Sequence, residues 1–121
     1  MIDNKQAPWR PTPQQQVVAV ATSILQGELG IIEGSRRLSD LQSRVTSLDH
    51  DPDFLPLVGI DSETDHLPLG EVRQHWAADA LAEKDIEIRA AEAFYRAAAF
   101  AACERLLARF GPTSNGYDRQ A

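Results

Sequence analysis

Cysteine is almost absent from this sequence, because Cys103 is the only one among 121 residues. A lone cysteine excludes a disulfide framework within the chain and a zinc site built from several cysteines, and it suits a reducing cytoplasm. No apolar run approaches the roughly 18 residues that a membrane span needs. Residues 1–16 lack the basic region and apolar core of a signal peptide. Together these absences predict a soluble, cytoplasmic protein.

The rest of the composition is typical of a globular domain. Hydrophobic residues make up 43% of the chain and charged residues 25%, which excludes wholesale disorder. The length fits one domain with a modest core. We expect that domain over residues 12–111, with flexible tails at 1–11 and 112–121.

Basic residues are missing from residues 45–72. The whole chain has 18 acidic and 12 basic residues, a formal net charge of −6. This segment holds seven of the acids, so the remainder has 11 acids and 12 bases and a net charge of +1. The seven are Asp49, Asp51, Asp53, Asp61, Glu63, Asp65 and Glu71. Such a segment repels nucleic-acid phosphates and attracts a basic protein or a cation, so nucleic acid is disfavoured as a partner.

Two helices are predicted in the N-terminal half. Thr12 followed by proline, with Gln15 three residues after the threonine, is typical of a capping box that begins a helix over residues 13–27. A second amphipathic pattern covers residues 31–48, with charged residues on the opposite side. Gly34 inside this pattern predicts close approach of a neighbouring helix.

The C-terminal half is predicted to begin with one or two turns at residues 51–58, which Pro56 keeps short. A polar connector at 61–70 and a short helix at 71–76 follow. A long helix then runs from about residue 78 to Phe110, where glycine and proline end it. We therefore predict an all-α fold, a small helical bundle with two N-terminal helices, a short connector helix and a long C-terminal helix.

The long helix has more apolar surface than one stripe needs. Eight alanines lie between Ala90 and Ala102, and alanine both favours a helix and lets another helix come near. We expect this helix to be covered from two directions, either by the first two helices or by a second subunit.

The connector DSETDHLPLG, residues 61–70, allows three interpretations. The first is a structural clamp formed by Asp61, Ser62, Asp65, Arg73 and Trp76. In this interpretation Ser62 caps nearby amides, and Arg73 returns to Asp61 or Asp65 as a two-pronged ion pair.

The second interpretation is chemistry at the histidines. A histidine beside a carboxylate is suited to acid–base catalysis because it titrates near neutrality, which points to Asp65 and His66. A weaker metal alternative adds His50, but the spacing fails the strict calcium-loop pattern. Cys103 lies among alanines, the setting of an inert buried thiol. The sequence assigns no catalytic residue, cofactor or metal.

The string from Ile60 to Asp65, followed by Leu67-Pro68, Gly70, Arg73 and Trp76, resembles a family signature. The family is one of small bacterial proteins of unknown function with the pattern IDSETD-x-LP-x-G-x-x-R-x-x-W, and the similarity covers roughly residues 14–111. The resemblance implies a compact helical fold with no established activity. Small acidic helical proteins of this kind are similar to immunity proteins that neutralise secreted toxins, although no residue roles carry over.

The third interpretation, and our leading hypothesis, is a non-enzymatic interaction protein. It would be an immunity-type inhibitor that binds a basic protein partner through residues 45–72, because complementary charge steers association. The expected contact residues are Asp49, Asp51, Asp53, Glu63 and Asp65. The alternatives are a metal-dependent or acid–base enzyme at Asp65 and His66, and a structural homo-oligomer that uses the alanine-rich face.

Overall fold

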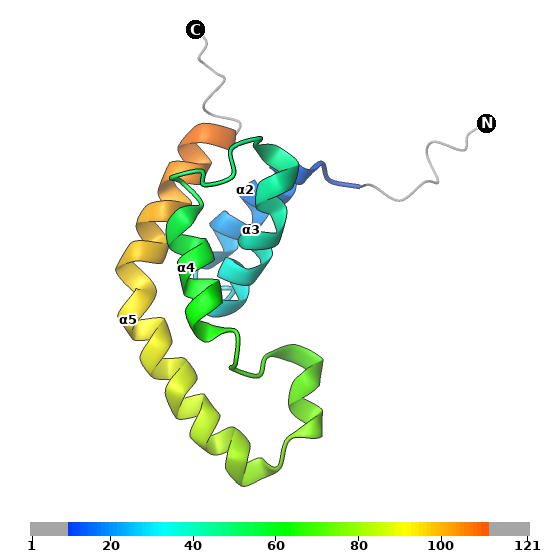
Figure 1. Cartoon of the computed structure of the whole chain (residues 1–121), viewed down its shortest axis with the longest axis vertical. Coiled ribbons are helices and arrows are strands. Elements are labelled where there is room, and N and C mark those ends of the chain that lie inside the picture. The colour runs from blue at the N-terminus through cyan, green and yellow to red at the C-terminus, as the bar shows by residue number, and fades with distance from the viewer. Residues whose placement is uncertain (1–9, 112–121) are drawn as a thin grey trace, which may run out of the picture.

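A computed structural model describes residues 10–111 of the chain, which fold entirely into helices and connections (Figure 1). The helices are α2 (Pro13–Leu25), α3 (Ile31–Val45), α4 (Leu55–Thr64), the 3₁₀ helix η1 (Gly70–His75) and α5 (Ala78–Phe110). The predicted all-α bundle is confirmed. Apart from Arg10 and Pro11, the predicted tails lie outside the described residues. No helix within residues 10–111 is long and apolar enough to cross a membrane.

The start of α2 forms as the sequence predicts. The Gln15 amide donates to Thr12 Oγ1 at 3.1 Å, and the Thr12 amide donates to Gln15 Oε1 at 2.9 Å. These reciprocal bonds are the predicted capping box. The helix ends at Leu25, two residues earlier than predicted. Gly27 adopts φ +78° there, a conformation that glycine reaches without steric cost.

The core lies between the α2–α3 hairpin, α4 and the C-terminal part of α5. It is formed by buried apolar side chains from all four α-helices and the loop before α4: Val17, Ala21, Ile24, Ile31, Leu38, Leu41, Phe54, Leu57, Ile60, Ala99, Ala102, Cys103 and Leu106. The buried residues of α5 all belong to its C-terminal part. Its N-terminal part continues past the other α-helices to η1 (Figure 1). About half of the longest helix therefore has little cover.

The first four residues of the segment expected as a polar connector belong to a helix, which corrects the prediction. Helix α4 spans Leu55–Thr64, so Asp61, Ser62 and Glu63 form its last turn and Asp65 caps it. The prediction treated Pro56 as a limit on helix length. Proline is instead favoured in the first turn, where its missing amide is not needed, and here Pro56 is the second residue of the helix.

A carboxylate from α5 completes the start of α3. Gly30 occupies the N-cap position of α3, and it has no side chain to accept the free amides. Glu92 takes this role, because its two carboxylate oxygens accept from the Ile31 and Ile32 amides, each at 2.9 Å. A negative charge at a helix N-terminus also interacts favourably with the helix dipole. This contact joins the middle of α5 to the hairpin.

Gly34 lies at a close approach of α3 to α2, as predicted. A Cβ at this position would lie 2.3 Å from Ile24 Cδ1 and 2.5 Å from Ile24 Cγ1. Ile24 is itself buried in the core, so it has little freedom to move aside. The glycine thus permits the hairpin to close.

Substituting Gly34 tests this packing. We expect Gly34→Ala to lower the free energy of unfolding by about 1–2 kcal/mol, because overpacking outweighs the roughly 1 kcal/mol gained in helix propensity. The matched control is Gly59→Ala in α4, where a Cβ meets nothing within 4 Å. That variant should gain about 0.5–1 kcal/mol. Urea unfolding followed by circular dichroism measures both, and equal responses would contradict the close approach.

Candidate functional site

Two of the predicted contact residues are engaged by arginines of α5. Asp51 is completely buried, and its carboxylate lies 2.8 Å from Arg109 Nη1. Asp53 lies 3.1 Å from the same nitrogen and 3.4 Å from Arg105 Nε. This cluster holds the loop after α3 against the end of α5. Asp51 is therefore corrected from a partner contact to a structural residue, because its carboxylate is covered.

The arginine also decides the protonation of Asp51. Burial alone would raise the pKa of this carboxyl, but hydrogen bonds from Arg109 and from the Asp53 amide outweigh burial and lower it. The Asp53 amide donates to Asp51 Oδ1 at 3.0 Å. Because the folded-state pKa is lowered, the ionised Asp51 stabilises the fold at neutral pH.

Asp61 belongs to a second ion pair, with Arg36 of α3. Arg36 Nε lies 3.7 Å from Asp61 Oδ1. Its Nη2 donates to the carbonyl of Thr64, the last residue of α4, and to that of Leu67 in the following loop. Carbonyls at a helix C-terminus lack intrahelical donors, so Arg36 satisfies them from a neighbouring helix. Sequence inspection missed this residue, because 28 positions separate Arg36 from Thr64.

The predicted clamp gives Arg73 the wrong partner. Arg73 makes a two-pronged contact, as expected, but with Asp85 of α5, at 2.8 Å and 3.1 Å. It also donates to the Pro68 carbonyl at 3.3 Å. The chain turns back into α5 directly after η1, which brings Asp85 to Arg73. Among the predicted clamp residues, Ser62 is exposed and Trp76 is 36% exposed.

Glu63 and Asp65 remain exposed at the C-terminal end of α4. Neither forms a salt bridge with any residue in the described range 10–111. These carboxylates lie at the negative end of the α4 helix dipole, where acids are disfavoured. The last turn of α4 contains no basic residue that would offset them. Their charge is thus available to a group outside the chain.

A groove lies beside these acids, between α4 and α5. It has a volume of about 410 Å³. Its rim carries Glu63, His66 and Glu87, and its apolar lining comes from Leu67, Ala90, Ala91, Phe94 and Tyr95. Phe94 is 79% exposed. The groove therefore combines an apolar surface with acidic charge.

The histidines do not assemble the alternative metal site. His66 Nε2 lies 3.2 Å from Glu87 Oε2, and Lys84 also contacts Glu87. His50 lies at the opposite end of α4, whose ten residues rise about 15 Å. Within residues 10–111 no three His, Cys, Asp or Glu side chains lie close enough together to hold an ion. The alternative prediction of a metal site formed by His50, Asp65 and His66 is therefore wrong.

Cys103 lies in the buried setting that the sequence predicts. Cys103 is fully buried in the core. Burial, together with the nearby charge of Glu104, raises the pKa of its thiol to about 11. The reactive form of cysteine is the thiolate, so Cys103 is suited to packing.

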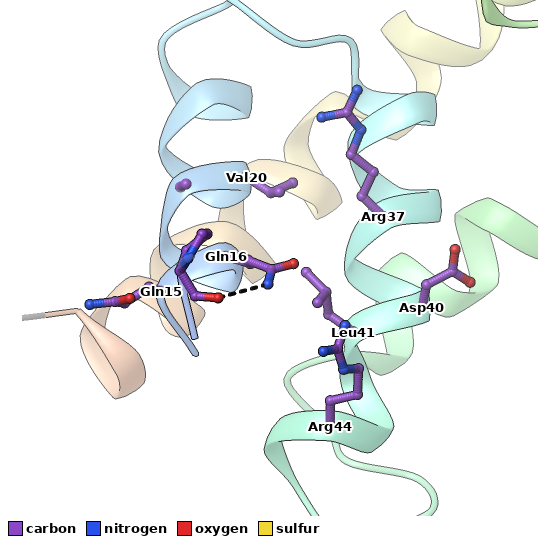
Figure 2. A pocket seen from close by; sticks show the side chains of 9 residues that line it. Gln15, Gln16, Val20, Arg37, Asp40, Leu41 and Arg44 are labelled. Atoms are coloured by element: carbon purple, nitrogen blue, oxygen red, sulfur yellow. Dashed lines mark hydrogen bonds between the residues drawn. The ribbon is translucent and has the colours of Figure 1, made fainter. Parts of the chain in front are cut away.

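A second groove, between α2 and α3, was not anticipated from the sequence. Figure 2 shows Gln16 and Val20 of α2 facing Leu41 and Arg44 of α3. The groove has a volume of about 460 Å³. The Gln16 side chain donates to the Pro11 carbonyl at 3.1 Å and so helps to hold one edge. The available signal was the charged side of α3, where Arg37, Asp40 and Arg44 recur at helical spacing.

Comparison with known proteins gives no family assignment: no family model, no curated protein and no solved structure matches this chain. The resemblance to the family with the IDSETD signature therefore stays a prediction.

Neutralising Asp51 tests the buried ion pair. Asp51→Asn should lower the free energy of unfolding at pH 7 by about 1–3 kcal/mol, because Arg109 loses a charged acceptor. The stability that Asp51 contributes is present above the unfolded pKa of about 3.9 and is lost as pH falls through the lowered folded pKa. Acid unfolding of the variant should therefore depend less on pH. Asp49→Asn, at an exposed position, is the control and should change stability by less than about 0.5 kcal/mol.

Thiol labelling tests the burial of Cys103. At pH 8 we expect the folded protein to react with an aromatic disulfide reagent at least 100-fold more slowly than the urea-unfolded chain, because burial suppresses the thiolate. The absorbance of the released thiolate gives both rates. Labelling of the folded protein at the rate of the unfolded chain would contradict an inert thiol.

Proposed function

We propose that this protein is a non-enzymatic interaction protein that binds a basic protein partner. The contact surface is the C-terminal end of α4 with the adjacent α4–α5 groove. Of the five predicted contact acids, Glu63 and Asp65 are the ones that border this surface. The observation that carries the proposal is their exposure without an ion-pair partner in residues 10–111.

Unpaired acids at the end of α4 destabilise the helix, and this energetic cost supports a function for them. Acids at the C-terminal end of a helix are destabilising by a few tenths of a kcal/mol to about 1 kcal/mol each. Arg36 offsets Asp61 and the end carbonyls, but no basic side chain within residues 10–111 pairs with Glu63 or Asp65. A lysine or arginine from a partner would relieve this repulsion. Binding would therefore gain from charge that the free protein leaves unbalanced.

The groove supplies the apolar part of the contact. Leu67 and Phe94 line it close to the acidic rim. Protein interfaces commonly have an apolar centre and a polar rim, and exposed aromatic residues are frequent anchors of binding energy. A basic segment with an apolar side chain beside its charges would match both features.

An immunity-type role is the form of this function that we favour. The acidic surface would neutralise a basic toxin by covering part of its cationic face. The support is the net charge of −6 and the exposure of Glu63 and Asp65 at the end of α4.

The experiment compares two variants of equal charge. Glu63→Gln/Asp65→Asn removes the two unpaired acids at the end of α4, whereas the control Asp40→Asn/Asp49→Asn removes two exposed acids elsewhere. The probes are helical peptides with lysine and leucine at amphipathic spacing, and the same peptides with glutamate in place of lysine. The groove variant should bind the basic peptides about tenfold more weakly than the control, a loss of roughly 1.4 kcal/mol.

Binding should also weaken as salt is added, since exposed charges are screened. Fluorescence anisotropy across a salt series measures both effects. Equal affinities of the two variants, or equal binding of the acidic peptides, would overturn the proposal.

A further inference from the structure

The groove between α2 and α3 has a polar end and an apolar body (Figure 2). Because the two helices form a hairpin, the start of α2 lies beside the end of α3. Pro11 and Gln16 therefore line the same end of the groove as Arg44. Val20 and Leu41 lie further along it, toward the turn of the hairpin. The groove thus places a charged group next to an apolar wall.

Arg44 is the charged group at the polar end, and it has no partner of its own. It is exposed, and no carboxylate within residues 10–111 forms a salt bridge with it. Figure 2 shows its side chain extending along α3 toward Leu41. A guanidinium presents its donors in a planar fork that matches the two oxygens of a carboxylate. This end of the groove is therefore suited to one carboxylate.

The other charged residues that line the groove are placed differently. Arg37 already pairs with Glu33, one turn earlier in α3. Asp40 also lines the groove, but its side chain points away from α2 in Figure 2. Arg44 is thus the charge that is both unpaired within residues 10–111 and directed along the apolar wall.

The apolar wall is held in place by the core. Leu41 is buried in the core, and Val20 packs against it, while the neighbouring Ala19 is exposed in the lining. The volume of about 460 Å³ lies within the roughly 300–1,000 Å³ of sites for small molecules. Specific protein interfaces are larger and carry several polar contacts. One free charge beside one short apolar wall matches a small amphiphile more closely than a protein surface.

We propose that the α2–α3 groove binds a small amphiphilic carboxylate, a molecule with one carboxylate and an apolar chain such as a medium-chain fatty acid. The carboxylate accepts two hydrogen bonds from Arg44, and the chain lies against Val20 and Leu41. This site does not depend on the binding of a basic partner at Glu63 and Asp65, because the two grooves are lined by different residues.

Titration of the full chain with decanoate, below the concentration at which it forms micelles, tests the site. Nuclear magnetic resonance of the isotope-labelled protein should show saturable shifts at amides that border the groove, including those of Ala19 and Arg44. In a series from butanoate to decanoate, each added CH₂ that reaches the wall should tighten binding by up to about fourfold. Decylamine, which has the same chain and the opposite charge, should leave these amides unshifted.

Charge variants test the role of the arginine. Arg44→Gln should weaken decanoate binding about tenfold, because a neutral amide replaces the charged donors. The matched control is Arg89→Gln, which removes an exposed arginine of α5 outside the groove and should bind like the wild type. Ala19→Glu and Ala19→Lys place opposite charges in the lining, so the first should weaken binding and the second should strengthen it. Circular dichroism checks that each variant folds.

Each contrary outcome overturns a stated part of the proposal. Groove amides that stay unshifted at millimolar decanoate overturn the site. Equal binding by Arg44→Gln and Arg89→Gln overturns the role of Arg44, and equal binding of decylamine overturns the preference for a carboxylate. A helical peptide with glutamate and leucine that shifts the same amides at lower concentration than decanoate would assign the groove to an acidic protein partner instead. Shifts that grow with protein concentration alone would assign it to a second copy of the chain.

Discussion

The contact between Glu92 and the first amides of α3 fixes the position of the longest helix. Gly30 gives α3 no cap of its own, so the helix depends on a carboxylate supplied 61 residues away. On the C-terminal side of Glu92, α5 enters the core beside α2 and α3. On its N-terminal side the helix leaves the bundle, and its main described ties are Arg73 with Asp85 and His66 with Glu87.

That division explains where functional surface is found. In the core part of α5, Arg105 and Arg109 engage Asp53 and Asp51, which converts part of an acidic loop into internal structure. Beyond the core, no arginine of the described part of the chain pairs with Glu63 or Asp65, and the α4–α5 groove lies open beside them. The unpaired acids therefore lie beside the N-terminal half of α5, which is also its less covered half.

The groove beside α4 joins unbalanced acidic charge to a small apolar lining, which favours a basic partner. Phe94 lies in this lining and is 79% exposed.

The sequence by itself determined the helices and their local signals. The capping box was predictable from Thr12 and Gln15, and the close approach from the place of Gly34 in a helical pattern. Both signals are local, because helical hydrogen bonds and side-chain neighbours lie three or four positions apart. The concentration of acids in residues 45–72 was readable from composition. Helix α4 was mispredicted because Pro56 was taken as a helix terminator when its place in a first turn makes it an initiator.

The tertiary structure decided which charges meet. Asp51 was predicted to face a partner and instead faces Arg109, and Arg73 was predicted to face Asp61 or Asp65 and instead faces Asp85. Glu92 and Arg36, which hold the ends of α3 and α4, gave no local signal. The physical reason is that an ion pair depends on how helices pack in space, and that packing is set by apolar faces that carry no information about individual charges.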